Sequence, residues 1–331
     1  MRDETGRTTS TATLDHDDVQ GLIERAAGAP SSHNTQPWRF RIETNGVAML
    51  ADTSRQLPVN DPADRELTIS CGCALMNLRV AAAAAGQRYH LELLPEGDHA
   101  ECLARVVWEE GDADAEEASL GSALARRRTY RKRFAPSTVP RESVEALAAM
   151  ADREGAWLQV VEWGESRRTV ARLVAEGDAS QWRDPRWREE LAGWMRPARQ
   201  GDGLSVPALL MPIIRGVVRK FDMGRRVGEH DRELTENAPL LVALGTQGDG
   251  RRDWLTAGLA LERVLLAGCQ LGMQASYLNQ PIQVSSLRDQ LRTALDRQGH
   301  PQILLRLGYP PGELPATPRR PVADLMRPAG D

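Results

Sequence analysis

Two stretches of the chain each combine several short strand-like runs with one long helix of small and apolar residues. Each long helix is apolar on nearly all sides, so it should be buried in a core. The first ends before Gly86 and the second before Gly272, as helices with a glycine C-cap do. The predicted strands are 39–43, 47–51, 88–94, 102–108, 157–163, 239–245 and 302–307. The predicted helices are 15–28, 66–85, a helix that follows Pro140, and 253–271.

The two long helices resemble each other in sequence. When the first is shifted by 186 positions, Gly72 falls on Gly258 and Gly86 falls on Gly272. Ala74, Leu75 and Ala82 then fall on Ala260, Leu261 and Gly268. Chance explains part of this match, since both helices are rich in small residues. A true duplication would place a homodimer in one chain, with a pseudo-twofold axis between its halves.

Composition shifts divide the chain. An acidic stretch, 109–117, separates the two repeats. We therefore expect a disordered N-terminus over 1–14, a first half over 15–117 and a second half over 118–331. A Pro-rich tail, 310–321, should run extended over the surface.

Residues 180–235 have no counterpart in the first half and are too long for a simple loop. They carry Trp and Met residues suited to covering an apolar ring, and Gly201 and Gly203 are candidate hinges. This segment is predicted to be a lid, and a packing element without function is the alternative.

Composition narrows the class of protein. The chain has 331 residues, of which 41% are hydrophobic and 27% charged, as is typical of a globular protein. Its net charge is −4, so its overall electrostatic field does not attract nucleic acid or an anionic membrane. It has no run of 18 apolar residues, and residues 1–13 lack the apolar core of a secretion signal, so we expect a cytoplasmic protein. Cys71 and Cys73 sit inside the first long helix and point in different directions, which favours buried thiols over a metal site.

The loop after the first helix carries the most informative motif, Pro-Ser-Ser-His-Asn-Thr-Gln-Pro-Trp at residues 30–38. Its hydroxyl, amide and backbone N–H groups are the equipment for binding a polar heterocycle or a phosphate. A plain connecting turn is the alternative. His33 is assigned no catalytic role, because a loop histidine is usually solvated.

A second motif is the basic run 126–133, which is followed by Phe134. Arginine forks suit a phosphate. A solvated charge cluster is the alternative, and a nucleic-acid patch finds no support in the acidic chain. Arg319 and Arg320 form a further basic pair in the tail, either bound to a phosphate or solvated.

Taken together, these motifs resemble those of the nitroreductase superfamily. The loop at 30–38 is similar to its Pro-Ser-Ser-x-Asn-x-Gln-Pro-Trp motif, and the basic run is similar to Arg-Arg-Ser-x-Arg-x-Phe, with Thr129 where serine is usual. Residues 307–310 and 319–322 resemble the closing Leu-Gly-Tyr-Pro and Arg-Arg-Pro-Leu pieces. The loop occurs only in the first half and the basic run only in the second, and this layout resembles the Acg-type proteins over about 15–328.

The resemblance implies an α+β nitroreductase-like fold of two related halves fused in one chain, with one FMN at their interface. The residues that it assigns to FMN are Pro30, Ser31, Ser32, Asn34, Gln36, Arg127, Arg128, Thr129, Arg131, Ser276, Tyr277, Leu278, Asn279, Arg319 and Arg320. No side chain is expected to be catalytic, because N5 of the flavin carries the chemistry.

For function, the resemblance implies hydride transfer from NAD(P)H to a small acceptor such as a nitro compound or a quinone. A protein that stores FMN under a lid is the alternative. No membrane or nucleic-acid partner is expected, and the fused dimer implies a monomer.

Overall fold

The computed structural model describes residues 14–197, 200–312 and 314–327. The disorder predicted for 1–14 therefore lies outside the described residues except at Leu14, which packs against the core. The strands are β1 (Trp38–Glu43), β2 (Gly46–Ala51), β3 (Arg88–Leu93), β4 (Cys102–Glu109), β5 (Trp157–Val160), β6 (Met195–Arg196), β7 (Leu204–Ser205), β8 (Leu240–Thr246), β9 (Gln274–Tyr277) and β10 (His300–Gly308). The helices are α1 (His16–Ala26), α2 (Arg65–Ala84), α3 (Ala115–Ser119), α4 (Gly121–Leu124), α5 (Arg141–Asp152), α6 (Glu165–Arg183), α7 (Pro185–Gly193), α8 (Met211–Lys220), α9 (Gly224–Glu236), α10 (Arg251–Gln270), α11 (Gln280–Gln283) and α12 (Ser285–Leu295).

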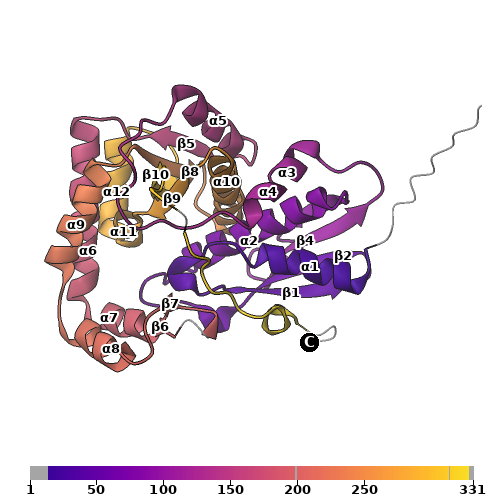
Figure 1. Ribbon diagram of the computed structural model, residues 1–331, viewed down its shortest axis with the longest axis horizontal. Coiled ribbons are helices and arrows are strands. Elements are labelled where there is room, and N and C mark those ends of the chain that lie inside the picture. The colour runs from indigo at the N-terminus through magenta and orange to yellow at the C-terminus, as the bar shows by residue number, and fades with distance from the viewer. Residues whose placement is uncertain (1–13, 198–199, 313, 328–331) are drawn as a thin grey trace, which may run out of the picture.

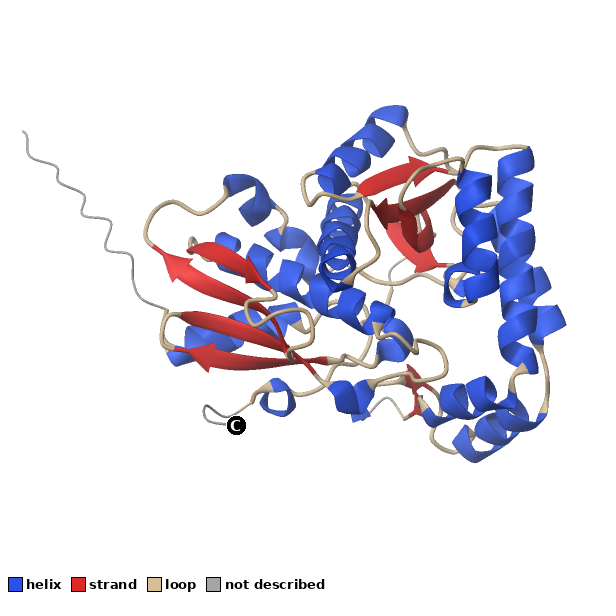
Figure 2. Ribbon diagram, turned by 180° about the vertical axis from the view of Figure 1, so that it is seen from behind, coloured by secondary structure: helices blue, strands red, loops and turns tan. Residues whose placement is uncertain are grey.

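Two four-stranded antiparallel sheets have the same topology. The first has the order β1-β2-β4-β3 and the second β5-β8-β10-β9. In each, two strands precede the long helix and two follow it, so the halves match strand for strand. The sheets lie apart, with α2 and α10 between them (Figure 2). The predicted fold of two related halves is confirmed, and the sequence missed the short strand β9.

The long helices cross at the pair of glycines that the repeat matched. A Cβ at Gly72 would lie 2.5 Å from the Leu255 carbonyl oxygen, and a Cβ at Gly258 would lie 2.1 Å from the Ile69 carbonyl oxygen. Ile69 and Leu255 are themselves 186 residues apart, so the contact is reciprocal. The pseudo-twofold axis therefore passes near these glycines, where two backbones touch without side chains between them.

The helix α2 is the centre of the hydrophobic core. It is long and apolar enough to cross a membrane by length and composition alone, but 89% of its apolar window is buried inside the fold. Cys71 and Cys73 are buried on it, as predicted. Its character is that of the core helix of a globular protein.

A buried ion cluster ties the halves together. Arg263 of α10 donates to Glu117 over 2.6 Å and to Glu154 over 2.7 Å. Arg79 of α2 donates to the same two carboxylates. Burial alone would raise the pKa of Glu154, but the guanidinium groups of Arg79 and Arg263 hold it below its usual value.

The extra segment of the second half is longer than the predicted 180–235. It occupies the connection 161–239 between β5 and β8, where the first half has only the turn Thr44-Asn45, one residue before the predicted Asn45-Gly46. The start of α6 was missed because its N-cap, Gly164, supplies no capping side chain. The segment contains α6 to α9, and α7 and α8 lie beside the first half (Figure 1).

The C-terminal tail runs back across the first half (Figure 1). Met326 forms a bridge with Phe40, and the Arg327 N–H donates to the Phe40 carbonyl over 2.8 Å. The tail thus carries Arg319 and Arg320 past the loop at 30–38.

Candidate functional site

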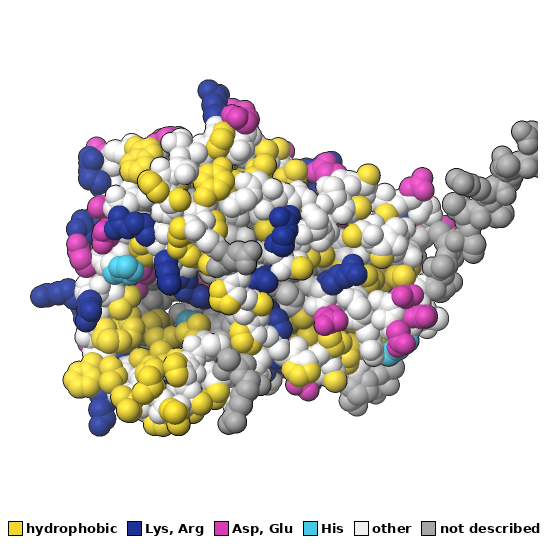
Figure 3. Space-filling view, in the orientation of Figure 1, with side chains coloured by type: hydrophobic (Ala, Val, Ile, Leu, Met, Phe, Trp, Pro, Cys, Tyr) yellow, Lys and Arg dark blue, Asp and Glu magenta, His cyan; other side chains and the backbone are white. Residues whose placement is uncertain are grey.

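A cavity of about 380 Å³ lies where the first half, the second half and the extra segment meet. Its volume is typical of small-molecule sites. A hollow opens on the face shown in Figure 3, and an apolar surface that includes the exposed Leu209, Leu210 and Ile213 lies over the α7–α8 region beside it.

Most of the residues that the sequence assigned to FMN line this one cavity. They are Pro30, Ser31, Ser32, Asn34, Thr129, Arg131, Ser276, Tyr277, Leu278, Asn279 and Arg319. The two halves contribute different segments, so the loop of one half and the basic run of the other meet in space.

Gln36, Arg127, Arg128 and Arg320 do not line the cavity. Gln36 donates to the Gly201 carbonyl over 2.8 Å and accepts from the Arg320 backbone N–H over 2.9 Å. Arg127 lies 3.2 Å from Glu262, and the Arg128 guanidinium donates to the Arg127 carbonyl. These four side chains hold protein groups together, and their role in cofactor binding stays a prediction.

The loop at 30–38 has a strained backbone. His33, Asn34 and Gln36 have φ angles of 51°, 55° and 51°. These angles lie in the left-handed region of backbone conformation, which residues other than glycine rarely adopt. Its neighbours stabilise it: the Ser31 hydroxyl accepts from the Gln36 N–H over 2.9 Å, and Arg319 donates to the Asn34 side chain over 3.1 Å. Strain of this kind is concentrated at functional sites.

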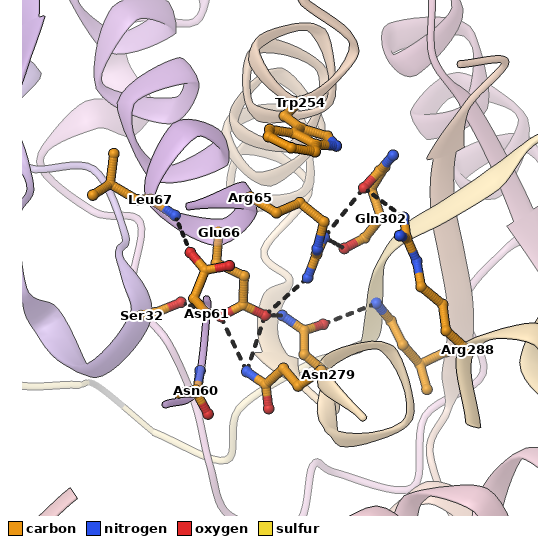
Figure 4. Close-up of polar contacts among 12 residues, drawn as sticks. Ser32, Asn60, Asp61, Arg65, Glu66, Leu67, Trp254, Asn279, Arg288 and Gln302 are labelled. Carbon is orange, nitrogen blue, oxygen red and sulfur yellow. Dashed lines mark hydrogen bonds and ion pairs between the residues drawn. The ribbon is translucent and has the colours of Figure 1, made fainter. Parts of the chain in front are cut away.

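Glu66, at the start of α2, is a buried carboxylate in the cavity wall that the sequence analysis missed. It accepts from the Ser32 hydroxyl over 2.5 Å and from Arg65 over 3.1 Å (Figure 4). It also accepts from the Gln283 amide over 2.9 Å. Asn279 also lies within reach, at 3.5 Å. The available signal was an Arg-Glu pair at the start of an otherwise apolar helix.

His33 also lines the cavity, although no role was predicted for it. Burial lowers its pKa to about 4, with Glu66 opposing this shift and Arg131 reinforcing it. The ring is therefore neutral at pH 7 and can offer one donor and one acceptor.

The extra segment forms one wall of the cavity, with Trp182 of α6 and Trp187 and Leu191 of α7. The two indole rings meet edge to face with centroids 5.5 Å apart, and the Trp187 N–H donates to Asn60 over 2.9 Å. The segment 201–203 is fastened to the loop, since the Gly203 N–H donates to the Asn34 carbonyl over 3.1 Å. The predicted hinges thus lie where the segment is tied down.

Several buried polar atoms of the lining have no hydrogen-bond partner among the described residues. They are His33 Nε2, Asn60 Nδ2, Tyr277 Oη, Gln280 Oε1 and Arg306 Nε. Buried polar groups are nearly always paired, so a ligand in the cavity is the natural source of the missing partners.

Comparison with known proteins places the chain in a family. It is 30% identical over 320 residues to Rv3131 of Mycobacterium tuberculosis, whose name assigns it to the NAD(P)H nitroreductases, and the match covers 94% of this chain and 92% of the relative. The chain belongs to the nitroreductase family. Two further relatives from the same organism are the acg protein, also named as an NAD(P)H nitroreductase, at 28% identity over 94% of this chain and 95% of the relative, and the uncharacterized protein Rv3127, at 31% over 93% and 92%.

No family model matches the chain. Among solved structures, nitroreductase NfnB from Mycobacterium smegmatis is 17% identical, with a TM-score of 0.42 over 64% of this chain and 99% of that one. A nitroreductase-like protein from Bacillus cereus is 12% identical, with a TM-score of 0.40 over 67% of this chain and 100% of that one.

Proposed function

We propose that the protein is an FMN-dependent NAD(P)H oxidoreductase with one flavin per chain. The observation that carries this proposal is the meeting of both half-specific motifs in one cavity. Relatives of this family over most of the chain are named as NAD(P)H nitroreductases, which supports it.

The hydrogen-bond donors that line the cavity are of the kinds that FMN requires. Arg131 lines the cavity and has no hydrogen bond or ion pair with any other described residue, so it is the side chain that would hold a phosphate. The unpaired atoms of His33 and Tyr277 would serve the polar edge of the ring. Burial raises the pKa of Tyr277, so its hydroxyl keeps its proton and remains a donor.

Bound FMN would accept a hydride from NAD(P)H and pass it to an acceptor. The cavity wall formed by Trp182, Trp187 and Leu191 would exclude water from the ring. One small cavity leaves room for the donor and the acceptor only in turn, so we expect ping-pong kinetics. We also propose a working monomer, since one chain supplies both halves of the site.

The direct test is absorption spectroscopy of the purified protein after FMN is added, followed by identification of the released cofactor. We expect flavin bands, FMN rather than FAD, and one FMN per chain. Steady oxidation of NAD(P)H with a quinone acceptor should follow. No flavin uptake, or two FMN per chain, would contradict the composite site.

Replacing Arg131 by alanine should weaken FMN binding. Loss of a charged donor to a phosphate costs about 1.5–3 kcal/mol, which is roughly a 10- to 150-fold loss of affinity. The measurement is an FMN titration that follows flavin fluorescence. Arg133→Ala is the matched control, because Arg133 belongs to the same run but is exposed and paired with Glu233. Equal affinities of the two variants would remove Arg131 from the site.

A second candidate function, storage of FMN under a lid, is favoured by the fastening of the segment 201–203. Asp202 is buried and accepts from Arg196 over 2.6 Å and from Arg55 of the first half. A stored flavin would be held tightly and reduced poorly by NAD(P)H. Steady-state NAD(P)H oxidation separates this function from the reductase.

Under either function, Asp202→Ala should release FMN faster. The substitution frees the segment from Arg55 and Arg196, and each 1.4 kcal/mol of anchoring lost corresponds to about tenfold in rate. Stopped-flow release of FMN into an excess of apoflavodoxin would measure this. Glu189→Ala, which removes an exposed ion pair of α7 with Arg219, is the control and should leave the rate unchanged. A variant that releases FMN at the original rate would show that the segment does not gate the cavity.

A further inference from the structure

Two carboxylates of the extra segment meet an amide of α11 in the cavity wall. Asp178 of α6, Asp231 of α9 and Gln280 of α11 all line it. The Gln280 amide donates to both Asp178 oxygens over 3.3 Å and to an Asp231 oxygen over 2.9 Å. One NH₂ group therefore connects two acids on separate helices.

Glycines bring these helices together. A Cβ at Gly177 would lie 2.7 Å from the Gln280 Cβ, and a Cβ at Gly228 would lie 2.8 Å from the Ala175 carbonyl oxygen and 3.3 Å from the Asp178 Cβ. Ordinary side chains at either position would separate Asp178 from its partners. The packing thus fixes Asp178, which is only 3% exposed, at the cavity wall.

A buried cation, Arg306, lies in the same part of the wall and is bonded only in part, since its Nη1 donates to the Lys132 carbonyl over 2.8 Å. Arg306 of β10 is 2% exposed, lines the cavity, and its Nε has no hydrogen-bond partner among the described residues. Burial raises the pKa of Asp231, and the charges of His230 and Arg306 oppose that rise. Of the two acids, Asp231 is therefore the one that carries the negative charge more readily. The Nε–H of Arg306 is available to donate to a ligand.

We propose that Asp178 is a catalytic acid that gives a proton to an oxygen atom of the acceptor bound in this cavity. The proposal rests on the proposed function, since it names the acceptor side of that site. The substrate class is an uncharged planar acceptor with a hydrogen-bond-accepting oxygen, such as a quinone or a nitroarene. The negative charge of Asp231 would repel an anionic acceptor.

The chemistry balances with the hydride of the proposed function. A quinone that gains one hydride from the reduced flavin and one proton from the Asp178 carboxyl group becomes a hydroquinone. The flavin is oxidised, the acceptor is reduced, and the O–H bond of Asp178 breaks as the new O–H bond forms. The Asp178 carboxylate then regains a proton from water while the next NAD(P)H is bound.

The surroundings of Asp178 allow it to hold that proton near neutral pH. Burial, and after it the charge of Asp231, raise the pKa of Asp178 to about 7 against the opposing hydrogen bond from Gln280. An acid with a pKa near the working pH is the most effective proton donor.

The test follows the two half-reactions of the FMN-loaded protein separately by stopped flow. Asp178→Asn should slow oxidation of the dithionite-reduced flavin by a quinone by about 10²-fold or more, and should abolish its pH dependence near pH 7. Reduction of the oxidised flavin by NAD(P)H should keep its rate. Glu176→Gln, on the exposed side of the same helix, is the matched control. An equal loss in both half-reactions, or an unchanged acceptor step, overturns the proposal.

Asp231→Asn provides a second variant that keeps the acid. It removes the neighbouring charge that raises the pKa of Asp178, so the pH at which the acceptor step fails should move lower. A pH profile that does not move overturns the proposal.

Thermal unfolding of the full chain without FMN gives a readout that does not depend on activity. An Asp with a pKa of about 7 when folded and about 3.9 when unfolded binds more protons in the folded state between these values. Stability is therefore lost as pH rises from about 4 to 7. The wild type and Glu176→Gln should show a fall in Tm that Asp178→Asn lacks, and equal pH curves overturn the proton-holding role. A protein that takes up no FMN but shows this difference would instead indicate failure of the proposed function.

Discussion

Replacing Gly258 by valine should destabilise the protein by more than about 3 kcal/mol. Overpacking a core usually costs about 1–3 kcal/mol, because side chains shift to make room. At Gly258 the obstacle is the Ile69 carbonyl oxygen, 2.1 Å from the position of a Cβ, and the Gly72 Cα lies 2.7 Å away. Backbone atoms cannot rotate away, so α2 and α10 must separate along their buried crossing. Urea unfolding followed by circular dichroism would measure the loss.

Gly21→Ala is the control for this prediction. Gly21 lies inside α1, and no atom lies within 4 Å of the position that an added methyl group would take. Alanine should therefore leave the stability unchanged or raise it by up to about 1 kcal/mol, as expected for a better helix former. A loss at Gly258 no larger than the change at Gly21 would mean that the helices tolerate a wider crossing.

Replacing Arg263 by methionine should cost about 3–5 kcal/mol, the usual penalty for breaking a buried ion pair from one side. The side chain is 4% exposed, and its removal leaves Arg79 as the one cation paired with Glu117 and Glu154 among the described residues, with the Tyr89 hydroxyl still donating to Glu117. The pKa of Glu154 is held below its usual value, so its contribution is present above about pH 4.3 and is lost as pH falls. Arg263→Met should flatten that part of the pH–stability curve.

Two further variants make the Arg263 prediction specific. Glu117→Gln added to Arg263→Met should recover part of the lost stability, because it removes one of the uncompensated buried charges. Arg153→Met, which breaks an exposed ion pair with Glu116, should change the free energy of unfolding by less than about 1 kcal/mol. If the double variant were less stable than Arg263→Met, the cluster would be held by something other than charge balance.

The elements that the sequence predicted well are those with strong local signals. The long apolar helices, the Asn45-Gly46 hairpin and the helix after Pro140 all formed close to their expected bounds. β9 has only four residues and α6 lacks a capping side chain, so neither gives a local signal that stands out. Their positions depend on tertiary contacts, which a single sequence does not display.

The site shows the same division. The motif loops were predicted because their residue types are unusual in series, whereas Glu66, Asp178 and Trp182 reach the cavity from helices whose packing was unknown. The arginine run shows a further limit. Thr129 pairs with Ala275, so the run is extended there; Thr129 and Arg131 line the cavity, and Arg128 does not. Alternate residues of an extended chain face opposite sides, which a motif match ignores.

The crossing of α2 and α10 also sets a problem for synthesis. The two glycines that touch are separated by 186 residues. At roughly 5–20 residues per second, α2 leaves the ribosome roughly 10–40 s before its partner exists. During that time the face of α2 that later packs on α10 has no partner, while its other faces can already pack on α1 and on the first sheet. The nascent first half is therefore expected to need a chaperone that shields this face of α2 until α10 is synthesised. In a homodimer of small subunits, the corresponding face would instead be buried when two finished chains associate.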